Sequence, residues 1–107
     1  MSLFNEREDA FEKQFAHDEE LRFKATARRD KLLGLLIAER LGKTGPDAQD
    51  YARSIVLADL QEAGDGDILR KIRQDLEGAG KPIHEAELHD MLARLMAQAI
   101  REIQAGQ

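Results

Sequence analysis

The chain has 107 residues, of which 42% are hydrophobic and 35% are charged, and its formal net charge at pH 7 is -5. This length fits one domain with a modest core, and the hydrophobic content excludes a low-hydrophobicity disordered chain. The negative charge argues against nucleic acid as a ligand, because such binding depends on neutralising phosphates. The absence of cysteine excludes disulfides, and the longest apolar run, at 32–38, is too short to span a bilayer. With no secretory signal at the N-terminus, we expect a cytoplasmic protein without membrane insertion.

The first element in the chain is an aromatic stripe within residues 4–15, FNEREDAFEKQF. On a helix, Phe4, Phe11 and Phe15 would share one narrow face, because steps of seven and four residues are close to whole turns. Their neighbours are nearly all charged or polar. Three phenylalanines on one stripe need a cover, either within this chain or on a partner.

Charged residues separate this stripe from the apolar residues that follow, because the same helix face would next carry Asp18, Arg22 and Arg29. The phenylalanines are therefore not an extension of the core. We predict an all-α protein in which residues 1–19 form a projecting arm that is partly disordered or marginally helical, and residues 20–107 form a small four-helix bundle.

We expect another protein to cover the phenylalanines of the arm. Burying one phenylalanine is worth about 1.5–3 kcal/mol, so three could offset the cost of ordering a short arm through coupled folding and binding. This pattern is typical of an amphipathic helix that docks in a groove. An arm that folds back onto the outside of the bundle is the open alternative. A membrane-surface helix is disfavoured, because residues 6–13 carry four acidic side chains and only two basic ones.

Glycine and proline divide the rest of the chain into four segments with helical periodicity. The first should end at Leu41 with Gly42 as its cap, and the second should start at 44–47 with Thr44 as cap and end at Gly64. The third should end at Gly78, and the fourth should begin after Pro82. The predicted core is aliphatic, with Phe23 and Tyr51 as the bundle's only aromatic residues. It comprises Leu21, Ala25, Leu32, Leu33, Leu35, Leu36, Leu41, Tyr51, Ala52, Ile55, Val56, Ala58, Ile68, Leu69, Ile72, Leu76, Leu88, Met91, Leu92, Leu95, Ala99 and Ile103.

Two short motifs resemble catalytic signatures without matching them. GKT at 42–44 lacks the glycine that a phosphate-binding loop needs five residues earlier, where Ile37 stands, so we interpret it as a helix cap and turn. In HEAELH at 84–89, the two histidines lie about 140° apart around a helix and cannot share a zinc ion on one face. Glu85 and His89 should form an ordinary surface pair. No metal site and no acid/base couple stands out, so we do not expect an enzyme.

His17 lies where the arm joins the bundle, beside the acidic residues 18–20. A histidine gains charge as the pH falls through about 6.5, so protonation of His17 could alter the helicity or binding of the arm. The simpler interpretation is an exposed histidine without a role.

Several stretches of the sequence resemble a known protein family. FAHDEELRFKATARRDKLLG at 15–34, LGKTG at 41–45 and DLEG at 75–78 resemble the zeta subunit of alphaproteobacterial F-type ATP synthases, a natural inhibitor of ATP hydrolysis. The likeness covers nearly the whole chain, although the middle of the second helix and the fourth helix match only in pattern.

The resemblance implies a four-helix bundle and a non-enzymatic function. In the family, the N-terminal arm enters a catalytic interface of the ATPase head as a helix and blocks rotation in the hydrolysis direction. The resemblance also implies that the alpha, beta and gamma subunits of the head are the partners. It further implies that the protein is peripheral to the membrane through the ATP synthase, and that it is a monomer when free. Carried onto this sequence, the arm residues that would bind the partner are Phe4, Glu6, Arg7, Glu8, Phe11, Lys13, Phe15 and His17, with the phenylalanines as anchors on burial grounds.

The family is also associated with weak binding of adenine nucleotides. The sequence has no phosphate-cradling motif, and the helix starts near 45–47 and 66–67 offer backbone donors beside aspartates that would repel phosphate. We therefore expect no tightly bound cofactor. Two rival functions remain: a nucleotide-responsive binding module whose arm only solubilises it, and an assembly scaffold for another complex.

Overall fold

The computed structural model describes residues 18–61 and 64–106 of the chain. Its regular structure consists of four helices, α2 (Glu19–Arg40), α3 (Gly45–Gln61), α4 (Gly66–Gly78) and α5 (Glu85–Gln104). The predictions of an all-α fold and of four helices are confirmed for this part of the chain. The arm residues up to His17 lie outside the described residues.

The helix ends follow the glycines that the sequence analysis identified. At the start of α2, Asp18 is the cap, and its Oδ1 accepts a hydrogen bond from the Leu21 N–H at 3.1 Å. At its end, Gly42 adopts a φ of 79°, and the Lys43 N–H donates to the Ala38 carbonyl at 2.9 Å. GKT is thus a helix stop, as predicted, because an L-residue rarely adopts the backbone conformation of Gly42.

The end of α4 differs in detail from the prediction. Gly78 is the last helical residue, but the left-handed position is two residues later, at Gly80, with a φ of 71°. There the Lys81 N–H donates to the Leu76 carbonyl at 2.8 Å. The helix and the turn therefore share the glycine-rich segment.

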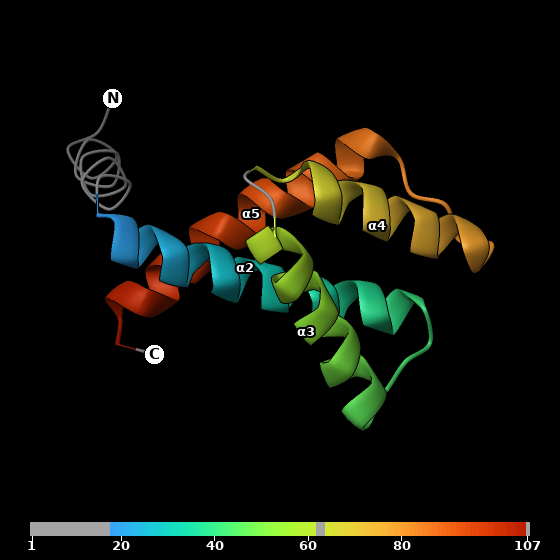
Figure 1. Cartoon of the computed structure of the whole chain (residues 1–107), viewed down its shortest axis with the longest axis horizontal. Helices are drawn as coiled ribbons and strands as arrows, with labels where there is room; N and C mark the ends of the chain where they lie inside the picture. Colours follow the sequence, from blue (N-terminus) through green and yellow to red (C-terminus); the bar gives the residue numbers. More distant parts are fainter. Residues whose placement is uncertain (1–17, 62–63, 107) are drawn as a thin grey trace.

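The other three helices pack around α2 (Figure 1). The ion pairs Arg28–Glu102 at 3.6 Å and Arg40–Glu87 at 2.7 Å join opposite ends of α2 and α5, which run antiparallel. Helix α3 crosses α2 at close range, where Gly34 meets Ala52. A Cβ at position 34 would lie 2.6 Å from the Cα of Ala52, so glycine is what permits this crossing.

The core contains most of the predicted residues, but on α2 it is centred elsewhere. Leu33, Ile37 and Ala38 are fully buried, whereas Leu36 is 41% exposed and Leu32 is half-buried. The reason is that α3 and α5 both pack against α2, in a segment that is apolar all round, so periodicity did not decide its buried face. The main cluster consists of Leu33, Ile37, Ala38, Tyr51, Ile55, Ile68, Ile72, Leu76, Leu88, Met91, Leu92 and Leu95.

Further predicted core residues lie at the margin of the core or outside it. Phe23 is 57% exposed, because neither of the helices beside α2 covers it. Partly buried are Leu21, Leu35, Leu41, Val56, Ala58, Leu69 and Ile103. Among the helices of 18–61 and 64–106, none is both long enough and apolar enough to cross a membrane.

Candidate functional site

The predicted partner-binding residues all belong to the arm. Phe4, Glu6, Arg7, Glu8, Phe11, Lys13, Phe15 and His17 precede residue 18 and lie outside the described residues. Their assignment, and the division at residue 19 into arm and bundle, stay predictions. What the structure gives is the surface of the bundle beside the point where the arm begins.

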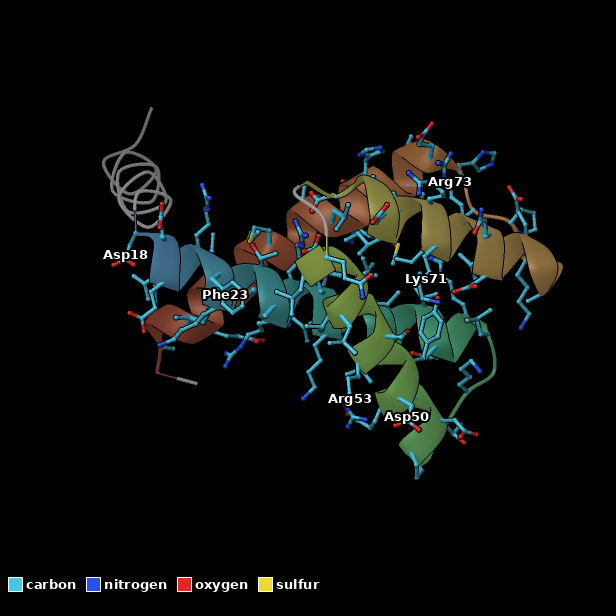
Figure 2. All side chains as sticks on the ribbon, viewed as in Figure 1. Asp18, Phe23, Asp50, Arg53, Lys71 and Arg73 are labelled. Carbon is cyan, nitrogen blue, oxygen red and sulfur yellow. The ribbon has the colours of Figure 1, made fainter. Side chains whose placement is uncertain are left out.

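That junction starts at Asp18, the cap of α2 (Figure 2), and includes two exposed apolar side chains. Phe23 on α2 is 57% exposed and Leu60 near the end of α3 is 54% exposed. Both line a pocket of about 650 Å³ between these two helices, with Thr26, Ala27 and Val56 among its other walls. We call it the junction pocket.

Four charged side chains meet at the wall of the junction pocket, and we call them the buried charge cluster. Arg29 and Asp30 come from α2, Asp59 from α3, and Asp65 is the cap residue of α4. Three of the side chains are almost fully covered, with exposed fractions of 7% for Arg29, 1% for Asp30 and 9% for Asp59. The cluster joins three helices at the middle of α2, where the end of α3 and the start of α4 meet it.

Arg29 is the centre of the cluster. Its Nη2 donates to Asp30 Oδ1 at 2.9 Å and to Asp65 Oδ1 at 2.7 Å, and it lies 3.6 Å from Asp59 Oδ2. Its Nη1 and Nε donate to Asp65 Oδ2 at 3.4 Å and to Asp30 Oδ1 at 3.1 Å. A guanidinium suits this position because its several N–H groups can serve two carboxylates together.

Burial changes the acid–base behaviour of the cluster. Desolvation, and then the hydrogen bond with Asp59, raise the pKa of Asp30 to about 8, against the opposing effect of Arg29. Burial alone would lower the pKa of Arg29, but its hydrogen bond with Asp65 and the charge of Asp30 raise it above its ordinary value. Asp30 is therefore mostly protonated at neutral pH, whereas Arg29 is charged.

The sequence analysis missed this cluster. Arg29 was expected only as one of the charges that separate the arm from the core, and no acid/base couple was expected, whereas in the structure Arg29 is buried and Asp30 is paired with Asp59 away from solvent. One signal was available: Arg29 lies four residues after buried Ala25 and four before buried Leu33, on the core side of α2. The pairing of Asp30 with Asp59 had no local signal, because it depends on how α3 crosses α2.

A second polar group joins α3 to α4. The Tyr51 hydroxyl donates a hydrogen bond to Asp75 Oδ2 at 2.8 Å. The ammonium group of Lys71, labelled in Figure 2, donates to the same oxygen at 3.0 Å and lies 5.2 Å from the centre of the tyrosine ring. Burial and the Asp75 hydrogen bond raise the pKa of Tyr51 above its ordinary value. These contacts satisfy the polar atoms at the edge of the core, which is a structural role.

The motifs near the other helix starts have ordinary contacts. Glu85 and His89 lie 3.9 Å apart with both side chains more than half exposed, which confirms the predicted surface pair. At the start of α4, Asp65 pairs with Arg29 and Asp67 pairs with Arg70 at 3.1 Å. Among residues 18–61 and 64–106, no three histidine, aspartate or glutamate side chains are grouped to hold a metal ion.

A bundle with a covered core and, beside its first helix, a pocket lined by both charged and apolar side chains defines a small helical protein suited to contacts with other proteins. The sequence model of the ATPase inhibitor subunit zeta family matches residues 1–102, so the chain belongs to this family and is an inhibitor, not an enzyme. A chain solved by solution NMR is 44% identical and superposes with a TM-score of 0.71, covering 81% of this chain and 99% of that one. A search of the curated proteins finds no match.

Proposed function

We propose that the protein inhibits ATP hydrolysis by an F-type ATP synthase, and that its arm does so by inserting as an amphipathic helix into a catalytic interface of the head. In this position the arm blocks rotation in the hydrolysis direction. The alpha, beta and gamma subunits form the binding site, and the association makes the protein peripheral to the membrane that holds the synthase.

The observation that carries the proposal is the extent of the family match, which begins at residue 1 and so includes the arm. The sequence of the arm supports the mechanism, because Phe4, Phe11 and Phe15 would share one helix face and lose water together in a groove. In the described part of the chain, the core is formed by residues of α2 to α5.

The proposal is tested by an ATPase assay on the purified synthase head. Phe11→Ala and Phe15→Ala should each weaken inhibition about tenfold or more, because each removes an anchor worth at least about 1.4 kcal/mol. Removal of residues 1–17 should abolish inhibition. The concentration for half inhibition is the measured quantity.

Leu57→Ala is the matched control. It removes an apolar side chain that is 52% exposed on α3 and lies outside the junction pocket, and it should leave inhibition within about threefold of the parent, since it deletes no arm anchor. Full potency after deletion of residues 1–17 would exclude the arm as the inhibitory element. Titration of ATP against the free protein addresses the nucleotide-module alternative, which requires tight binding that does not depend on the arm.

A further inference from the structure

The buried charge cluster contains more negative than positive groups. One guanidinium, that of Arg29, faces the carboxyl groups of Asp30, Asp59 and Asp65. With every group ionised, two negative charges would be left over, although Asp30 and Asp59 are buried side by side. Two close carboxylates in a dry site cannot both ionise cheaply, so such a pair retains a proton.

We propose that the buried charge cluster is a pH-sensitive switch: one proton, held on Asp30 against Asp59, keeps the end of α3 and the start of α4 against α2, and its loss in alkaline solution releases them. This inference goes beyond the proposed function and does not depend on it.

The geometry explains why the proton belongs to Asp30. Its side chain is 1% exposed, so its charged form is the most poorly hydrated of the three carboxylates. Asp65, in contrast, is 42% exposed and receives two hydrogen bonds from Arg29, so it is both hydrated and paired. A neutral Asp30 can donate to Asp59 while its other oxygen accepts from Arg29, so every member of the cluster has a partner.

Each helix near Asp30 contributes known charges. Its own helix α2 contributes Arg29, and Glu19 and Arg22 line the junction pocket nearer the solvent. Helix α3 contributes Asp59, and the start of α4 contributes Asp65. Helix α5 places Glu102 against this stretch of α2, where it pairs with Arg28 instead. No further cation at the described contacts of Asp30 compensates a second carboxylate charge there.

The direction of the pH effect follows from linkage. The pKa of Asp30 is raised in the folded protein to about 8, whereas in the unfolded chain it lies near its ordinary value of about 3.9. The folded state therefore binds the extra proton between these values. The contribution of this proton to the stability of the folded protein is complete below the pKa that Asp30 has in the unfolded chain. It decreases as the pH rises and is lost above about 8.

The switch predicts a specific behaviour of Asp30→Asn in the full chain. The amide mimics the protonated acid, because it can donate to Asp59 and accept from Arg29 without a charge. The urea midpoint of the parent, followed by circular dichroism, should fall from pH 6 to pH 9, whereas that of Asp30→Asn should stay nearly constant. At pH 9 the variant should be the more stable protein. Hydrogen exchange of amides at 64–69 should accelerate with pH beyond the intrinsic rate in the parent only.

Asp50→Asn is the matched control, because Asp50 pairs with Arg53 on the surface and its side chain is 70% exposed. Its pH profile should run parallel to that of the parent. A carboxyl ¹³C NMR titration of the parent tests the switch without a variant: Asp30 should titrate near pH 8, and Asp59→Asn should lower that midpoint. A midpoint near the ordinary value of about 3.9, or an Asp30→Asn profile with the slope of the parent, would overturn the proposal.

Discussion

At the scale of single residues, Arg29 is the side chain on which the buried charge cluster depends. Replacing it by leucine keeps an apolar stem but leaves Asp30, Asp59 and Asp65 without their cation. Breaking a buried ion pair from one side costs about 3–5 kcal/mol, so Arg29→Leu should lower the free energy of unfolding by about this amount at pH 7. Urea unfolding with linear extrapolation measures the loss.

Arg53→Leu provides the comparison for this substitution. Arg53 pairs with Asp50 at 3.1 Å, but both side chains are about 70% exposed, and such pairs contribute little. This control should change the free energy of unfolding by less than about 0.5 kcal/mol. An equally small effect of Arg29→Leu would mean that solvent or additional protons, and not the guanidinium, stabilise the three carboxyl groups.

The buried charge cluster shows what sequence patterns do not reveal about single residues. A charged residue in a stretch rich in charges is expected to be solvated, and that is correct for Arg22 but wrong for Arg29. The difference arises because α3 and the start of α4 cover Arg29 and bring Asp65 to it, 36 positions away in the chain. Local spacing carries no information on such a pairing, so it could not be predicted.

At the scale of helices, the contact of α2 with α3 depends on Gly34. Glycine inside a helix is less favourable than alanine by roughly 0.5–1 kcal/mol, so Gly34→Ala would stabilise an isolated α2. In the bundle, the added Cβ would lie 2.6 Å from the Ala52 Cα, a backbone atom that cannot move alone. We therefore expect a net loss of about 1–3 kcal/mol in the free energy of unfolding, measured by urea denaturation.

Gly78→Ala is the control for the crossing of α2 and α3. Gly78 is the last residue of α4, and a Cβ there would meet nothing within 4 Å. This substitution should be neutral or slightly stabilising. If Gly34→Ala were as stable as Gly78→Ala, the two helices would be able to separate at no cost, and the close approach would not be a constraint on the fold.

The helices that the sequence predicted best are those with one clear apolar stripe. On α4, Ile68, Ile72 and Leu76 are buried as expected, and so are Leu88 and Leu92 on α5. On α2, residues 32–38 place apolar side chains on every face of the helix. The positions of the neighbouring helices therefore determine that Leu33 and Ile37 are buried and that Leu36 is exposed. Helix ends were predictable because glycine and proline mark them locally.

At the scale of the whole molecule, the candidate site has two parts of different predictability. The stripe of phenylalanines in the arm can be recognised from sequence spacing, and the family from the resemblance of several stretches of the sequence to it. The junction pocket could not be predicted from the sequence, because its exposed residues Phe23 and Leu60 come from two different helices. Phe23 was expected to be buried, and Leu60 was not considered. Exposure depends on which neighbours are missing, and a sequence pattern records only the neighbours on the same helix.

The bundle should fold without the arm. The described core runs from Leu33 to Leu95, and α2 has its own cap in Asp18, so deletion of residues 1–17 should leave the bundle folded. We expect the free energy of unfolding to change by less than about 1 kcal/mol. Circular dichroism at increasing urea measures it. Asp18→Ala, which should cost about 0.5–2 kcal/mol, shows that the assay detects damage at the junction. A phenylalanine buried on the bundle is worth about 1.5–3 kcal/mol, so a loss of that size or more on deletion would show that the arm packs against its own helices.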